Sequence, residues 1–140
     1  MKRLNRLIIL ELARLQDKSS FYAPRAAIWT SERTYLEPDL FYVSAATEGR
    51  LDPEHRTTAD LVIEVISPGS AIYDRNTKAD TYAALGVKEL WLVDEIKETV
   101  EVRTLRGDRY GEGELFAKGD QLTSSVVPEM TILVAKIFED

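Results

Sequence analysis

The sequence contains no cysteine and only one histidine, His55. Without cysteine the chain can form neither disulfides nor a thiolate metal site, and a single histidine excludes most zinc arrangements. Any metal in this protein would therefore be held mainly by oxygen ligands.

Long apolar runs are also missing. No stretch reaches the roughly 18 residues of a membrane span, and the basic start MKRLNR leads into an amphipathic pattern rather than a signal peptide. We therefore expect a cytoplasmic protein with no membrane partner. The net charge of −6 argues against a general electrostatic attraction to nucleic acid, although a local basic rim is still compatible with it.

The composition is typical of one globular domain. The 140 residues are 44% hydrophobic and 30% charged, which allows a modest core and a single site. Apolar residues on a 3.6-residue period predict a helix over 4–16. We find no internal repeat, linker or low-complexity segment, so residues 1–140 are expected to form one α/β domain.

Two strand-like segments, FYAPRAAIW and TYLEPDLFYVS, follow this helix. The polar SERT between them predicts a hairpin turn. The stretch 45–58 is polar and contains glycine and proline, so a surface loop is expected there.

The middle of the chain predicts a βαβ unit. ADLVIEVI is typical of a buried strand, DRNTKADTYAAL of a helix that ends at Gly86, and KELWLVD of a second strand. Apolar residues on both faces of the two strands favour parallel neighbours. The later segments, from ETVEVRTL to MTILV, are expected to complete the sheet.

The first strand of this unit carries an acid, Glu64, inside an apolar run. Residues two apart in a strand share a face, which places Glu64 on the same side as Asp60. In the preceding strand, Asp39 shares a face with Phe41 and Val43 by the same rule. If these strands are neighbours, Asp39 and Glu64 approach each other on one face.

Two carboxylates in an apolar setting repel each other and lose hydration unless a cation compensates. Lys78 is the nearest suitable cation, and helical spacing places it on the face with Tyr82 that packs on the sheet. Asp39, Glu64 and Lys78 are therefore candidate catalytic residues, with the carboxylates suited to Mg²⁺ and the ammonium suited to orienting water or stabilising phosphate charge. A structural ion pair between Glu64 and Lys78 explains those two residues about equally well.

At these residues the chain resembles a known family. LEPDLFYVS, then ADLVIEVISPGS, then DRNTKADTYAALGVKELWLVDEIKETVEV resemble the Uma family of restriction-endonuclease-like proteins, within the PD-(D/E)XK nuclease superfamily. The similarity is strong over 35–102 and weaker at VVPEMTILVAKIF. It implies a restriction-endonuclease-like α/β fold in which an amino-terminal helix and the Lys78 helix flank a mixed central sheet.

The resemblance also implies roles for the site residues. Asp39 matches the acid of the PD motif, Glu64 matches the acid of (D/E)XK, and Val65 would offer its backbone carbonyl to the metal. Ile66 stands where the motif usually has lysine, and Lys78 matches the family's lysine on the next helix. Family members usually carry an amino-terminal extension with a strand pair before this first helix, so this chain is expected to be either a short member of the family or truncated at its start.

The function implied is hydrolysis of DNA phosphodiester bonds with Mg²⁺, for which Mn²⁺ would substitute. A homodimer is expected, because nucleases of this superfamily that cut both strands often present two active sites. An exposed sheet edge or the helix over 4–15 would provide the pairing surface. The alternative is a catalytically silent binding or assembly module that retains the nuclease fold.

Other polar and aromatic residues have simpler interpretations. We expect Asp60 to be a solvated strand-end acid rather than a second metal ligand, and Tyr82 and Trp91 to belong to the core. His55 is expected to be solvated in its loop. Arg75 is expected to flank the helix start, with a phosphate contact as the alternative.

Overall fold

The computed structural model describes residues 20–66 and 72–139. The helix predicted over 4–16 and the SPGS segment at 67–70 lie outside the described residues. Within the described part, none of the helices combines the length and apolar character that crossing a membrane requires.

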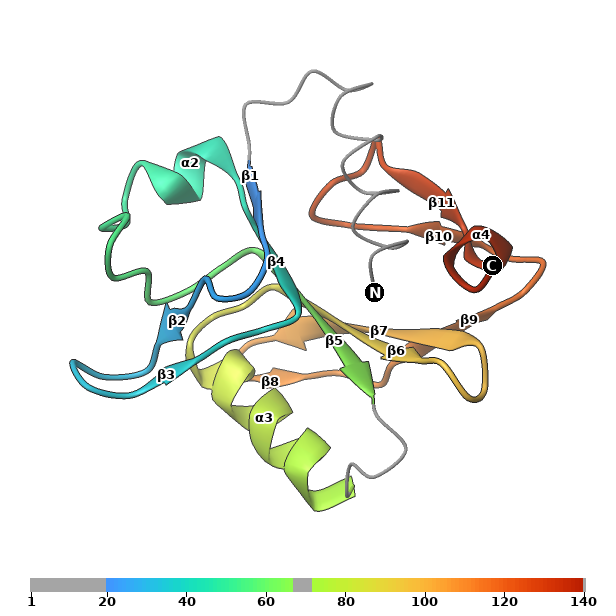
Figure 1. Cartoon of the computed structure of the whole chain (residues 1–140), viewed down its shortest axis with the longest axis horizontal. Coiled ribbons are helices and arrows are strands. Elements are labelled where there is room, and N and C mark those ends of the chain that lie inside the picture. The colour runs from blue at the N-terminus through green and yellow to red at the C-terminus, as the bar shows by residue number, and fades with distance from the viewer. Residues whose placement is uncertain (1–19, 67–71, 140) are drawn as a thin grey trace.

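A mixed β-sheet forms the centre of the molecule (Figure 1). Its strands run in the order β1-β4-β5-β6-β7-β8, and β9 also pairs with β7. Only β5 and β6 are parallel among these pairs, so the sheet is mixed as the sequence predicts. The strands are β1 (Ser20–Tyr22), β4 (Leu40–Val43), β5 (Leu61–Ile66), β6 (Glu89–Asp94), β7 (Thr99–Arg106), β8 (Arg109–Tyr110) and β9 (Glu114–Ala117).

The helix α3 (Ile72–Ala84) connects the parallel strands β5 and β6, which confirms the predicted βαβ unit. Its carboxyl end is closed by two backbone bonds, from Gly86 N–H to Ala83 O at 3.0 Å and from Val87 N–H to Tyr82 O at 3.1 Å. Gly86 has a φ of +84°, a conformation that glycine adopts without a side-chain clash. The expected end of the helix at Gly86 is therefore confirmed.

Alternate residues of β5 enter two different apolar clusters, as a period of two requires. Val62 and Ile66 face α3 and pack in the cluster that contains Tyr82, whereas Leu61 and Ile63 face the opposite cluster around Trp91. Figure 1 shows α3 lying along one side of the sheet, with β10, β11 and α4 away from it. The helix therefore covers the face on which Glu64 lies.

The prediction that the later segments complete the sheet is confirmed for β7, β8 and β9 and wrong for the last two strands. β10 (Gln121–Thr123) and β11 (Thr131–Leu133) pair only with each other among the described strands, and α4 (Val134–Ile137) follows. Each strand buries only its middle residue, Leu122 or Ile132, in the cluster around Trp91. This short ribbon packs over the face of the sheet around Trp91.

Two details of the amino-terminal half differ from the predictions. The first strand-like segment divides into β1 and β2 (Ile28–Trp29), and the second into β3 (Tyr35–Leu36) and β4; the predicted hairpin is the β2–β3 pair. The expected loop at 45–58 begins with a short helix, α2 (Ala45–Glu48). Ser44 caps this helix by accepting a hydrogen bond from Thr47 N–H at 3.2 Å.

Candidate active site

The antiparallel register of β4 and β5 brings the two predicted acids together. Leu40 lies opposite Ile63, so Asp39, one residue before β4, lies opposite Glu64. The Asp39 N–H donates to Glu64 Oε1 at 3.3 Å, and the Val65 N–H donates to Asp39 Oδ2 at 2.8 Å. Each acid is thus held in place by the backbone beside the other.

The backbone of Val65 meets Asp39 through its N–H group. A residue in a strand directs its N–H and C=O toward the same edge of that strand. Because the N–H of Val65 meets Asp39, we expect its carbonyl to point to the edge where Asp39 lies. Three oxygen donors, from Asp39, Glu64 and the Val65 carbonyl, therefore belong to one small region of the sheet.

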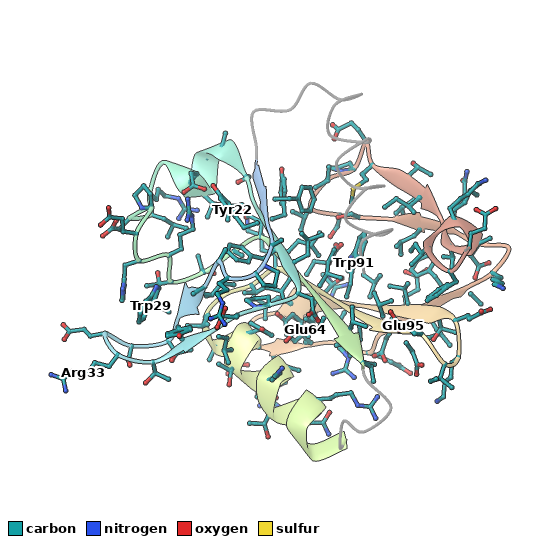
Figure 2. All side chains as sticks on the ribbon, in the orientation of Figure 1. Tyr22, Trp29, Arg33, Glu64, Trp91 and Glu95 are labelled. Carbon is teal, nitrogen blue, oxygen red and sulfur yellow. The ribbon has the colours of Figure 1, made fainter. Side chains whose placement is uncertain are left out.

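Helix α3 adds two side chains to the acids. Tyr82, which is 1% exposed, donates its hydroxyl to Glu64 Oε2 at 3.0 Å. The Lys78 ammonium lies 3.4 Å from the same oxygen, and the lysine side chain is 55% exposed. Figure 2 shows Glu64 between the sheet and α3. Lys78 therefore reaches Glu64 from the solvent side and Tyr82 reaches it from the core.

The surroundings of Glu64 disfavour its charged form. Burial is the largest effect and raises its pKa above the ordinary value of 4.5, and the negative charge of Asp39 acts in the same direction. The Lys78 ammonium, the Asp39 N–H and the Tyr82 hydroxyl lower the pKa, but they do not outweigh burial. Glu64 is therefore a carboxylate that gains from an added cation.

Tyr82 keeps its proton in this environment. Burial and the neighbouring charge of Glu64 both raise the pKa of Tyr82 far above its ordinary value of 10.0. A phenol in this state donates a hydrogen bond and does not act as a base near neutral pH. The sequence-based interpretation of Tyr82 as a core residue is correct for its ring but missed its hydroxyl, because an aromatic on a packing face carries no separate signal.

A cleft of about 320 Å³ opens over these groups. Asp39, Glu64, Lys78 and Tyr82 all line it, and so does Arg75 from the first turn of α3. Further lining residues are Glu37, Val65, Ile66, Thr77, Leu90 and Leu92. Both acids and two cations are thus accessible from one cavity.

The donor set fits Mg²⁺. Among the described residues no group of three or more histidine, cysteine, aspartate and glutamate side chains could hold a metal. Mg²⁺ typically takes only one or two carboxylates and completes its octahedron with water and substrate phosphate. Asp39, Glu64 and the Val65 carbonyl supply hard oxygen atoms of this kind.

Asp60 lies outside this cleft, and its expected solvation is wrong. Asp60 is 2% exposed and accepts hydrogen bonds from Ser44 N–H at 2.8 Å and Thr47 Oγ1 at 3.0 Å, with Lys88 at 3.1 Å. Burial alone would raise the pKa of Asp60, but these hydrogen bonds outweigh it and hold the pKa below 3.8. Asp60 therefore ties α2 to the start of β5.

Two other side chains have clear structural roles. His55 is half-buried and stacks on Trp29 with ring centroids 4.6 Å apart, so its expected solvation is also wrong. Trp91 is fully buried and donates its indole N–H to Glu89 Oε1 at 2.7 Å, which confirms its assignment to the core. Neither residue lines the cleft.

The mixed sheet, its covering helix and the paired acids define a restriction-endonuclease-like α/β protein, and comparison with known proteins gives the family. The Uma2 family, described as "Putative restriction endonuclease", matches residues 2–135, and the chain belongs to it. A crystal structure described as a putative nuclease belonging to DUF820 from Anabaena variabilis superposes with a TM-score of 0.73 at 16% identity. That match covers 95% of this chain and 74% of the other. No curated protein matches the chain.

These comparisons confirm the family resemblance and the restriction-endonuclease-like fold predicted from the sequence. The family match also supports a nuclease function in general terms. The catalytic and metal-binding roles of the site residues remain predictions. The residues concerned are Asp39, Glu64, Val65 and Lys78.

Proposed function

We propose that this protein is a Mg²⁺-dependent endonuclease that hydrolyses phosphodiester bonds of DNA. The observation that carries the proposal is the meeting of Asp39, Glu64 and Lys78 in one cleft, with Glu64 hydrogen-bonded or paired to the other two. Membership of a family of putative restriction endonucleases supports it.

The acids would hold the metal together with the Val65 carbonyl. When bound, Mg²⁺ lowers the pKa of a water molecule and neutralises charge on the phosphate. Asp39 is oriented by the Val65 N–H, and Glu64 by the Tyr82 hydroxyl, so both carboxylates are positioned before any ligand enters. Because the carboxylates are already positioned, metal binding requires less reorganisation of the site.

Lys78 is suited to act on the attacking water or on the phosphate. Its ammonium is within reach of Glu64, and its side chain is more than half exposed along the cleft. A cation at this position can orient the nucleophile or stabilise the negative charge of the transition state. Ile66 occupies the position where the motif usually has lysine, and Lys78 on the following helix would take over the role of that lysine.

Metal titration tests the proposal directly. We expect calorimetry to detect Mn²⁺ binding to the wild type, Asp39→Asn to abolish it, and Mg²⁺ to support nicking of a supercoiled plasmid that EDTA stops. Asp120→Asn is the matched control, because Asp120 also accepts a backbone N–H, from Ala117 at 2.8 Å, but lies outside the cleft. No metal binding by the wild type at millimolar Mn²⁺, with no cleavage, would instead favour the catalytically silent binding or assembly module.

We further propose that the active form is a homodimer, because two sites in one complex would allow both strands of a duplex to be cut together. β9 is an outer strand of the sheet, and its hydrophobic residue Leu115 is exposed to solvent. Light scattering at tens of micromolar protein would show a dimer; a monomer at that concentration would contradict the proposal.

A further inference from the structure

The cleft contains one cationic side chain that the proposed chemistry has not used. Arg75 is the fourth residue of α3 and lines the cleft beside Lys78 and Glu64. The spacing to Ala79 and Tyr82, four and seven residues later, places Arg75 on the helix face that packs on the sheet. Its position is therefore set by the same helix that positions Lys78.

The Nε atom of Arg75 is buried, and no described residue provides it with a hydrogen-bond partner. A buried N–H that has lost water without gaining an acceptor is costly, so few are found in folded proteins. Such an atom beside a cleft is explained most simply by an acceptor that arrives from outside.

The acids of the site do not provide this acceptor. Glu64 is already engaged by Lys78 and Tyr82, and Asp39 accepts the Val65 N–H. Among the described residues no ion pair joins Arg75 to either acid. Among the described residues nothing therefore engages the Nε of Arg75, whereas Lys78 is engaged with Glu64.

The chemistry of arginine indicates which ligand. The guanidinium group is planar and presents its N–H donors as a fork that matches two oxygens of a phosphate. The protein carries a net charge of −6, so a DNA backbone must be held by local cations rather than by the overall field. Arg75 lies next to the paired acids and has an N–H donor that no described residue uses, so it can serve as such a local cation.

We propose that Arg75 binds a backbone phosphate of the DNA and holds the phosphodiester against Asp39 and Glu64. This inference rests on the proposed function and adds a phosphate-binding residue to it. Lys78 would then be left to the nucleophile or the transition state, while Arg75 fixes the substrate.

The test is DNA binding without metal, measured by fluorescence anisotropy of a labelled duplex in EDTA over a series of KCl concentrations. We expect Arg75→Gln to weaken binding and to reduce the slope of log affinity against log salt by about 0.9, the value for one lost phosphate contact. Arg75→Lys should keep the slope but bind more weakly than the wild type, because the charge remains and the fork is lost.

Arg109→Gln is the matched control. It removes the same charge from β8, where the Arg109 side chain is 83% exposed and paired with Asp108, and it should leave affinity and slope unchanged. Thermal melts of all variants establish that each is folded. Wild-type affinity and slope in Arg75→Gln, or the same loss in Arg109→Gln, would overturn the inference.

Cleavage separates this inference from the proposed function. Mg²⁺-dependent nicking by the wild type together with an unchanged Arg75→Gln binding curve would refute the phosphate contact and leave the nuclease intact. Loss of binding in Arg75→Gln from a wild type that never cleaves would support the contact and contradict the nuclease. A wild type that does not bind DNA at all would overturn both.

Discussion

The Tyr82 hydroxyl donates to Glu64 Oε2 at 3.0 Å, across the interface between α3 and β5. The same oxygen is approached by the Lys78 ammonium at 3.4 Å. One carboxylate oxygen is thus shared by a neutral donor from the core and a charged donor from the solvent side. The strength with which Glu64 holds its proton depends on both.

Tyr82→Phe removes the neutral donor. The pKa of Glu64 should rise further, so metal binding should require a higher pH than in the wild type. Losing a hydrogen bond to a buried carboxylate should also cost about 1–2 kcal/mol in the free energy of unfolding. The pH dependence of Mn²⁺ affinity by calorimetry, together with chemical denaturation, measures both effects.

Tyr110→Phe is the control for this experiment. Tyr110 donates its hydroxyl to the Val87 carbonyl at 2.8 Å, so its removal should lower stability by a similar or smaller amount, about 0.5–1.5 kcal/mol. Metal affinity and its pH dependence should not change. Identical metal-binding profiles in the wild type and Tyr82→Phe would show that the hydroxyl does not tune Glu64.

Glu64→Gln tests whether Glu64 is a functional acid or part of a structural ion pair. Because burial raises the pKa of Glu64 above 4.5, its contribution to stability is fully present below pH 4.5 and is lost as the pH rises through the raised value. Glutamine does not titrate. We therefore expect the metal-free variant to be as stable as the wild type or more stable at neutral pH, while the metal-induced rise in melting temperature disappears.

The opposite outcome would identify a structural pair. Lys78 is 55% exposed, so its attraction to Glu64 is screened by solvent and should contribute no more than about 1 kcal/mol. Thermal melts with and without Mg²⁺ separate the two cases. A loss of metal-free stability in Glu64→Gln, with no effect of metal on the wild type, would contradict the nuclease proposal.

Lys78→Gln should separate catalysis from metal binding. The variant keeps both carboxylates, so Mn²⁺ binding should persist, while plasmid nicking should fall by about 10²-fold or more because the cation that stabilises developing charge is lost. Lys88→Gln is the control, since Lys88 pairs with buried Asp60 at 3.1 Å and is similarly exposed. Equal nicking rates in Lys78→Gln and Lys88→Gln would exclude a catalytic role for Lys78.

Asp60→Asn should affect stability and leave the site intact. The pKa of Asp60 lies below 3.8, so its contribution is present above that pH and is lost as the pH falls through the lowered value. We expect a loss of about 1–3 kcal/mol at neutral pH that narrows in acid, measured by chemical denaturation. Metal affinity should match the wild type; a loss of binding would show that the two ends of β5 are coupled.

The positions of Asp39 and Glu64 could be predicted because strands have a strict period. Alternation placed each acid on one face of its own strand, and the two acids meet because β4 and β5 are neighbours, which the sequence alone left as an assumption. Helical spacing similarly placed Lys78 beside the same sheet face, whereas Arg75, expected only to flank the helix start, also lines the cleft. Prediction from sequence succeeds where the direction of a side chain follows from the periodicity of its own helix or strand.

Interactions between distant segments could not be predicted in this way. The burial of Asp60 depends on α2, a four-residue helix in a polar stretch whose only signal is the capping residue Ser44. The contact of His55 with Trp29 likewise joins a loop to a hairpin. β10 and β11 have the alternation of sheet strands, but their pattern does not indicate whether they extend the central sheet or cover it.

The pairing of Leu40 with Ile63 sets the alignment of the core and of the acids at once. A slip of β5 by one residue would turn Glu64 into the cluster around Trp91 and bring Ile63 or Val65 to the face of Asp39. Such a sheet would bury an uncompensated carboxylate and leave the cleft without its second acid. Glu64 lowers the stability of the native fold, but it lowers the stability of a misaligned sheet further. The misaligned sheet that would lack the site is therefore also disfavoured during folding.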